Sequence, residues 1–242
     1  MSGMRKVVVT GGGTGIGREV AARFAAGGDD VVITGRRGQV LEATAHELAG
    51  SVRAVVVDGL DTAGIEAVAQ ELGAVDVLVN NAGGNTDFDR PAPQGLAEVA
   101  AAWRSNVDAN LTTAVLMTTA LLPAMTAGAS IITIGSIAAD KGAGSYGAAK
   151  AAVASWNVDL ARMVGKRGIT ANIVSPGYIA DTEFFRDVLD DERRQALVAA
   201  TMTKRAGTPA DVAAMVTFLA SPAARQITGQ TLAVNGGEWP SR

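Results

Sequence analysis

Lys6-Val-Val-Val-Thr10 runs directly into Gly11-Gly-Gly-Thr-Gly-Ile-Gly17 near the start of the chain. A continuous apolar run of this length predicts a strand buried on both faces, as in parallel sheets. The apolar residues that follow have helical spacing, so the order is strand, glycine loop, helix. Glycines let a backbone approach a pyrophosphate, and the helix N-terminus adds N–H groups and a positive dipole end. The stretch therefore predicts a nucleotide site beside the first strand.

The same alternation of strand and helix continues to the end of the chain. Apolar runs predict seven strands at residues 6–10, 30–34, 53–57, 75–79, 130–134, 169–174 and 230–234. After the first helix, helical patterns cover residues 40–48, 62–72, 95–125, 145–164, 182–203 and 209–220. Strands that alternate with helices are typical of βαβ units. We expect an α/β fold with a doubly wound, parallel seven-stranded sheet, helices on both faces, and a single domain over residues 1–242.

Composition narrows the classes of partner. The 242 residues carry a net charge of −3 and no basic stripe, which disfavours nucleic acid. No cysteine is present and His46 is the only histidine, so we expect no metal site. No run of about 18 apolar residues exists, and the first apolar run is too short for a signal peptide. We therefore expect no membrane partner and a cytoplasmic location.

Tyr146 and Lys150 are the candidate catalytic pair. They are four residues apart in a predicted helix, which puts both side chains on one face. A nearby ammonium group favours the phenolate and would lower the tyrosine's pKa from about 10. Such a tyrosine can give a proton to a carbonyl oxygen or take one from an alcohol. Ser136, at the start of the preceding glycine-rich loop, can hydrogen-bond the same oxygen. The alternative is a Tyr–Lys pair on a solvated helix face.

The end of the second strand indicates which dinucleotide is preferred. An acidic residue there would bind a ribose 2′-hydroxyl, but Arg36 and Arg37 occupy the position. An arginine fork suits a 2′-phosphate, so NADP(H) is favoured and NAD(H) stays possible. Asp58, followed by Gly59, is placed to accept a hydrogen bond from the adenine amino group. The alternative for Asp58 is an ordinary turn aspartate.

The ordered motifs resemble the short-chain dehydrogenase/reductase family over nearly the whole chain. They are, in order, TGGGTGIG at 10–17, Asp58, NNAG at 80–83, NL at 110–111, Ser136, Tyr146-x-x-x-Lys150 and PG at 176–177. The resemblance implies a Rossmann fold and a hydride transfer between a nicotinamide cofactor and a carbonyl or secondary alcohol. It implies acid–base catalysis by Tyr146, a supporting Lys150, an orienting Ser136 and a proton relay anchored by Asn110. The positions that it implies for the cofactor are Gly11, Thr14, Gly15, Ile16, Gly17, Asn81 and Ile179.

Other features depart from the family pattern or carry a structural alternative. The loop between Ser136 and Tyr146 is slightly trimmed, and Thr182 comes one residue late after the PG motif. Asn80 and Asn81 also have a structural alternative, in which their side-chain amides tie neighbouring strands together, and for Asn80 we favour it. Phe184 and Phe185 lie where the family has a mobile lid over the substrate. The acidic run that begins at Asp187 is interpreted as a solvated helix face.

Three functional hypotheses remain open. The leading one is an NADP(H)-dependent carbonyl reductase or alcohol dehydrogenase with a small-molecule substrate. A narrower one is a 3-oxoacyl-carrier-protein reductase, resembled in ITIGS at 132–136, with Lys166 and Arg167 as candidate contacts to an acidic carrier protein. The third is a non-catalytic, cofactor-sensing protein on the same fold. The family usually assembles through its two longest helices, here 95–125 and 145–164, so we expect a homotetramer or homodimer.

Overall fold

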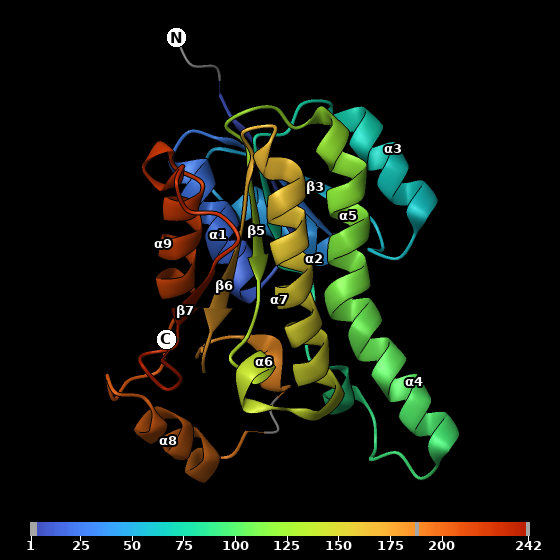
Figure 1. Ribbon diagram of the computed structural model, residues 1–242, viewed down its shortest axis with the longest axis vertical. Helices are drawn as coiled ribbons and strands as arrows, with labels where there is room; N and C mark the ends of the chain where they lie inside the picture. The colour runs from blue at the N-terminus through green and yellow to red at the C-terminus, as the bar shows by residue number, and fades with distance from the viewer. Residues whose placement is uncertain (1–3, 187–188, 241–242) are drawn as a thin grey trace.

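A computed structural model describes residues 4–186 and 189–240 (Figure 1). Seven strands form one parallel sheet with the order β3-β2-β1-β4-β5-β6-β7. Their bounds are β1 Lys6–Thr10, β2 Asp30–Gly35, β3 Ser51–Val56, β4 Val77–Asn80, β5 Ser130–Ile134, β6 Thr170–Pro176 and β7 Thr231–Val234. From the central β1–β4 pair, the chain adds β2 and β3 on one side and β5, β6 and β7 on the other. The predicted doubly wound α/β architecture and its seven strands are confirmed. The ends of the predicted 1–242 domain lie outside the described residues.

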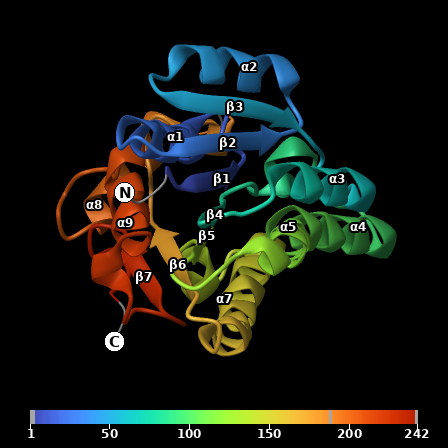
Figure 2. The same cartoon turned by 90° about the horizontal axis from the view of Figure 1, so that it is seen from above.

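Helices cover both faces of the sheet (Figure 2). The α-helices are α1 Gly15–Ala26, α2 Gly38–Glu47, α3 Thr62–Leu72, α4 Leu96–Val107, α5 Thr113–Leu121, α6 Ala138–Lys141, α7 Gly144–Gly165, α8 Asp191–Ala200 and α9 Pro209–Leu219. Alternate residues of each strand point to opposite faces. Val7, Val9 and Ile33 accordingly pack with α1 and α9, whereas Val8 and Leu78 pack with α3, α5 and α7. The two apolar layers explain why the central strands read as continuous apolar runs.

The helix predicted over 95–125 is interrupted. A π-helical turn, η2 Asp108–Thr112, lies between α4 and α5, and a 3₁₀ turn, η3 Leu122–Ala124, follows at Pro123. Inside the π turn, Asn110 Nδ2 donates to the backbone oxygens of Asn106 and Gly84, each at 2.9 Å. A side chain that bonds into the helical ladder and to a distant loop is a physical cause for such a break.

Two other segments differ from the prediction. The helix expected over 182–203 consists of a 3₁₀ turn, η4 Glu183–Phe185, and α8, where Asp190 accepts from the backbone N of Arg193. Residues 187–188, which include the predicted start of the acidic run, lie outside the described residues. The glycine-rich loop before Tyr146 contains the short helix α6, which follows Ser136 because its Oγ accepts from the backbone N of Ala138 at 3.1 Å.

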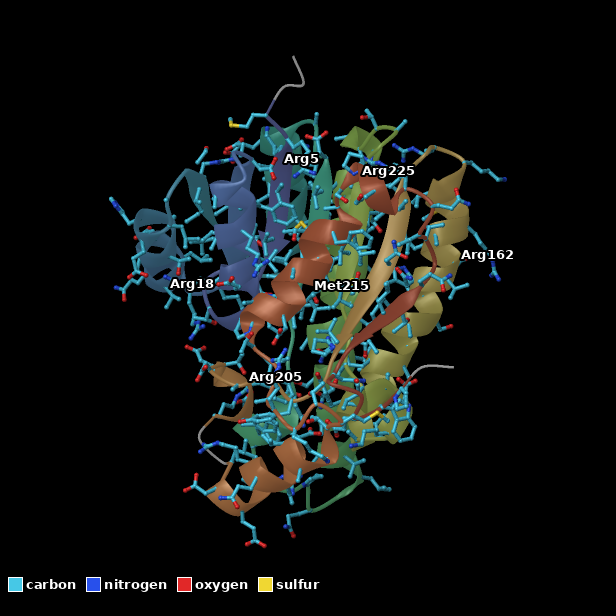
Figure 3. All side chains as sticks on the ribbon, turned by 90° about the vertical axis from the view of Figure 1, so that its left-hand side faces the viewer. Arg5, Arg18, Arg162, Arg205, Met215 and Arg225 are labelled. Carbon is cyan, nitrogen blue, oxygen red and sulfur yellow. The ribbon has the colours of Figure 1, made fainter. Side chains whose placement is uncertain are left out.

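The strands point toward α6 and α8, so this end of the molecule holds the carboxyl ends of the sheet (Figure 1). Figure 3 shows Arg205 toward this end and Arg5 and Arg225 at the opposite end. In open parallel sheets, ligands bind outside the carboxyl ends, where the strand order reverses. Here the reversal lies between β1 and β4, which places the glycine loop in the expected crevice.

Candidate functional site

A cavity of about 2170 Å³ lies at the carboxyl ends of the strands. Its lining joins the glycine loop after β1 to Asn81 after β4, Ser136 after β5 and Ile179 after β6. Tyr146 and Lys150 line the same cavity from α7. The structure therefore brings together, in one continuous space, residues that the sequence separates by more than a hundred positions.

The glycine loop has conformations that only glycine accommodates well. Gly15 has φ +52°, and a Cβ at Gly17 would lie 2.3 Å from the Gly11 oxygen. Asn81 braces this loop, because its Nδ2 donates to the backbone oxygens of Thr10 and Gly11 at 3.0 Å. Asn81, predicted to bind cofactor, is thus a strut between the ends of β1 and β4.

Asn80 is also structural, but the predicted partner was wrong. Its Nδ2 donates to Thr118 Oγ1 at 2.9 Å, so it ties β4 to helix α5 and not to a neighbouring strand. The reason is that the Asn80 side chain points to the face of the sheet that α5 covers, since the side chains of Asn80 and Asn81 leave the strand on opposite faces.

The N-terminus of α1 faces the cavity without a side-chain cap from Thr14. Thr14 Oγ1 instead accepts from Arg37 Nη2 at 3.2 Å, and the same Nη2 donates to Glu183 Oε2 at 2.9 Å. Arg36 lines the cavity beside them. The predicted 2′-phosphate residues are therefore at the cavity edge, and Arg37 is engaged by a carboxylate that the sequence did not associate with it.

Asp58 and Gly59 line the cavity on the far side of β2. The Asp58 carboxylate accepts from the backbone N of Leu60 at 3.0 Å, which is the turn arrangement given as its alternative. A Cβ at Gly59 would lie 2.9 Å from Thr113 Cγ2, so this glycine lets the loop approach α5. One Asp58 side chain can serve both the turn and an adenine, because a carboxylate accepts several hydrogen bonds.

Tyr146 and Lys150 are both buried, each 6% exposed, on the cavity side of α7. Lys150 Nζ lies 5.9 Å from the centre of the Tyr146 ring and donates to the Ile134 oxygen at 2.8 Å. The Ser136 side chain hydrogen-bonds Tyr146. The helical spacing thus places the pair as predicted, and the end of β5 supplies both Ser136 and the carbonyl that holds the lysine. A solvated face is excluded for this pair.

The predicted lowering of the Tyr146 pKa is wrong for this structure. Burial raises the pKa of Tyr146 to about 12, and the hydrogen bond from Ser136 opposes that rise only in part. Burial also lowers the pKa of Lys150 to about 8. Desolvation disfavours the charged form of each group and is the largest cause of both shifts. The site therefore holds Tyr146 as a neutral phenol, which is the form that donates a proton.

Asn110 is buried in the π turn and its side chain is committed to the fold. Besides the two donated bonds, its Oδ1 accepts from the backbone N of Gly84 at 3.1 Å. These contacts fix the loop after β4 against α4 and α5. The Asn110 side-chain amide holds the cavity wall. A role for Asn110 in the predicted proton relay therefore leaves only its backbone groups to take part.

An aromatic cluster covers Tyr146. The rings of Phe184 and Tyr146 are 5.6 Å apart, and Phe184 also contacts Phe88 at 5.8 Å and Phe185 at 4.9 Å. Thr182 lies against the glycine loop, with its Cγ2 3.5 Å from where a Cβ of Gly15 would be. The 182–185 segment thus spans the cavity from the glycine loop to Tyr146.

Sequence reasoning missed two polar groups, of which only the second lines the cavity. Ser145 donates to Asp87 Oδ2 at 2.9 Å, and Asn106 Nδ2 contacts both of these side chains. Lys141 pairs with the buried carboxylate of Glu238. Ser145, in the first group, lies where the glycine-rich loop passes into a helix, and that transition is a local signal. The contact between Lys141 and Glu238 spans 97 positions, and no local pattern indicates it.

Within residues 4–186 and 189–240, no group of three or more His, Asp and Glu side chains is placed to hold a metal ion. His46 is exposed in the last turn of α2. None of the helices in the described residues is long and apolar enough to cross a membrane.

Comparisons with known proteins agree over nearly the full length. Residues 11–238 match a family model described as enoyl-(acyl carrier protein) reductase. The chain is 36% identical over 241 residues to the 3-oxoacyl-[acyl-carrier-protein] reductase FabG of Escherichia coli K12, covering 95% of each chain. A Brucella melitensis structure described as a short-chain dehydrogenase/reductase, glucose/ribitol dehydrogenase, has 33% identity and a TM-score of 0.87, covering 98% of this chain and 97% of that one. A blue fluorescent protein from a metagenomic library, solved with NADPH, has 36% identity, a TM-score of 0.85 and 98% coverage of both chains.

Proposed function

The chain belongs to the short-chain dehydrogenase/reductase family and is an oxidoreductase, and from that premise we propose the reaction and its residues. The reaction is hydride transfer between NADP(H) and a carbonyl or secondary-alcohol substrate. The observation that carries it is the buried Tyr146–Lys150 pair, hydrogen-bonded at Ser136 and Ile134 in the cavity that contains the glycine loop.

In reduction, Tyr146 donates its phenolic proton to the carbonyl oxygen, and in oxidation it accepts the alcohol proton. Ser136 donates a hydrogen bond to the same oxygen and so orients it. Lys150, held by the Ile134 oxygen, lies next to the tyrosine and stabilises negative charge that develops there. The apolar cover formed by Phe184 keeps water from the reacting oxygen.

The glycine loop fits a dinucleotide. Gly17 lets α1 start against the Gly11 backbone, Gly15 takes up the positive φ of the turn, and the uncapped N-terminus of α1 supplies N–H donors for a pyrophosphate. Gly11, Thr14, Ile16, Asp58, Gly59, Asn81 and Ile179 complete the proposed cofactor contacts. When bound, the nicotinamide supplies or accepts the hydride.

Arg36 and Arg37 favour NADP(H) over NAD(H), because two guanidinium groups at the end of β2 complement a 2′-phosphate. The similar metagenomic protein was solved with NADPH, which supports the same choice. Binding of that phosphate would require Arg37 to exchange its Glu183 partner for the ligand.

Isotope transfer tests the proposed function directly. NADPH labelled with deuterium at C4 of the nicotinamide, incubated with a panel of ketones and aldehydes, should yield alcohols that carry deuterium on the former carbonyl carbon. NADPH binding without label transfer to any member of the panel would instead support the cofactor-sensing alternative.

A second candidate function is 3-oxoacyl-carrier-protein reduction, which the similarity to FabG supports. The predicted carrier contacts do not support it. Lys166 and Arg167 follow the far end of α7, about 24 Å along the axis from Lys150 at 1.5 Å per residue. Arg167 there donates to the backbone oxygens of Leu122 and Met125. Comparing acetoacetyl thioesters with simple ketones separates the two functions.

We also propose assembly and location. Exposed apolar side chains on α4 and α7, including Val99, Trp103 and Val158, are suited to a homotetramer or homodimer built on these helices. We propose a cytoplasmic location because the chain is similar to FabG, whose name gives a substrate carried by an acyl carrier protein. For the leading function, we propose no partners beyond small molecules and further copies of the chain.

A further inference from the structure

A second polar pair lies in the cavity, apart from Tyr146 and Lys150. Glu238, from the segment after β7, and Lys141, from α6, both line the cavity and form an ion pair. The Glu238 side chain is only 3% exposed, whereas that of Lys141 is 38% exposed. The pair connects the C-terminal segment to the short helix that follows Ser136.

Glu238 lies on the substrate half of the cavity. The backbone N of Ile137, next to Ser136, donates to the Pro176 oxygen at 3.1 Å. Glu238 Oε2 lies 3.4 Å from where a Cβ of the adjacent Gly177 would be. The carboxylate is therefore separated from the Ser136 loop by only the Pro176-Gly177 backbone.

The carboxylate has unused hydrogen-bonding capacity. Lys141 engages Oε1, while Oε2 is buried and, among the residues that the structure describes, has no hydrogen-bond partner. A buried carboxylate oxygen without a partner is unfavourable, and such atoms are uncommon in native proteins. At the edge of a binding cavity, an unsatisfied acceptor indicates a ligand group that donates to it.

The charges around Oε2 restrict that ligand group. A second carboxylate would be repelled by Glu238, and an ammonium group would be repelled by Lys141. A trans secondary amide is neutral, but its N–H and C=O point in opposite directions and cannot both reach an ion pair. A hydroxyl oxygen donates to the carboxylate and accepts from the ammonium group at a single atom.

We propose that Glu238 and Lys141 form a hydroxyl-binding subsite, so that the substrate is a hydroxylated ketone or the corresponding diol. This inference rests on the proposed function. The reacting carbonyl lies at Tyr146 and Ser136, the substrate's hydroxyl donates to Glu238 Oε2 and accepts from Lys141, and the carbon skeleton contacts Phe184. Glu238 and Lys141 act as specificity residues and take no part in proton transfer.

The test compares ligands that differ by one hydroxyl. In one arm, kcat/KM with NADPH is measured for 2-butanone and 4-hydroxy-2-butanone, and for 2-pentanone and 5-hydroxy-2-pentanone. In the other, calorimetry measures binding of 2-butanol and 1,3-butanediol to the protein with NADP⁺ at a pH where turnover is negligible. Wild-type protein should favour at least one hydroxylated member in each arm by roughly tenfold or more, since the hydroxyl bonds to charged groups.

Glu238→Gln and the double substitution Lys141→Met/Glu238→Met should remove that preference and leave kcat/KM for the plain ketones within about twofold. The double substitution guards against misfolding, because replacing both partners of a buried ion pair leaves no unpaired charge. Glu71→Gln, which removes the partner of Arg53 outside the cavity, is the matched control and should change nothing.

Two results overturn the subsite: equal wild-type binding of 1,3-butanediol and 2-butanol, or a hydroxyl preference that survives both substitutions. A binding preference that the substitutions remove, without reduction of any ketone, would support the subsite and contradict the proposed reaction. The two arms therefore separate failure of this inference from failure of the proposed function.

Discussion

At the scale of single residues, burial controls the chemistry of the site more than helical spacing does. Tyr146 and Lys150 face the same cavity, yet each is shifted toward its neutral form. The lysine is kept in place by the Ile134 oxygen, a backbone acceptor from the neighbouring strand end. Its buried ammonium group carries a cost to stability that depends on pH.

The pKa of Lys150 predicts that dependence. A pKa lowered from 10.5 to about 8 means that the folded chain binds this proton more weakly than the unfolded chain. Between these two values the unfolded chain carries more protons, so the free energy of unfolding rises with pH. Below about pH 8 both states are protonated and the cost is fully present. Relative to Lys150→Met, the wild type should gain roughly 2 kcal/mol between pH 7.5 and 10.

Urea unfolding at several pH values checks this prediction. The opposite shift of Tyr146, from 10 to about 12, lowers stability only above about pH 10 and lies outside the window. Lys166→Met, which alters an exposed lysine just after the same helix, serves as the control. Parallel stability curves for wild type and Lys150→Met would contradict a destabilising buried charge.

Arg37 yields a second prediction at this scale. Arg37→Ala removes a guanidinium group that complements a 2′-phosphate, so Kd for NADPH should rise roughly tenfold while Kd for NADH stays nearly constant. Glu183→Gln weakens the competing ion pair and should lower Kd for NADPH. Fluorescence titration with both cofactors measures this, and an equal loss for NADH after Arg37→Ala would mean that Arg37 does not read the phosphate.

At the scale of elements, the apolar runs located all seven predicted strands, although β4 and β6 begin and end one or two residues later than predicted, and sequence patterns failed where a distant partner decides. The strand β5 is buried at every residue, so its apolar run marks its bounds without error. The break at Asn110 depends on Gly84, 26 positions away, and the engagement of Arg37 depends on Glu183, 146 positions away. Such contacts leave no local pattern. The predicted carrier contact of Lys166 failed for a different reason. The length of its helix alone places Lys166 far from Lys150, and the sequence already shows that length.

The π turn gives the prediction at this scale. Asn110→Asp keeps the size of the side chain but removes the donors to Asn106 and Gly84 in a buried site. We expect a loss of about 2–3 kcal/mol in the free energy of unfolding, because buried acceptors lose their partners beside a new charge. Asn85→Asp is the matched control, since among the described residues the Asn85 side chain bonds only through its Oδ1, which a carboxylate retains. A similar urea midpoint for both variants would show that Asn110 is not holding the turn.

At the scale of the whole molecule, the sheet brings the glycine loop and Tyr146 from different halves of the chain to one edge. Helices α4 and α7 pack beside each other and expose Trp103 and Val158 on the surface. Light scattering should give four times, or twice, the 24.5 kDa chain mass. Trp103→Asp/Val158→Asp should reduce it, because charges in an apolar interface oppose association. A wild-type mass of one chain would refute the assembly.

The central claim is that the Tyr146 hydroxyl supplies the proton in carbonyl reduction. Tyr146→Phe removes that oxygen while leaving the ring that packs on Phe184. Single-turnover NADPH oxidation with a reactive ketone, measured beside NADPH binding, tests the claim most directly. The rate should fall by a factor of about 10² or more with Kd for NADPH nearly unchanged. A variant that oxidises NADPH at the wild-type rate would contradict the assignment.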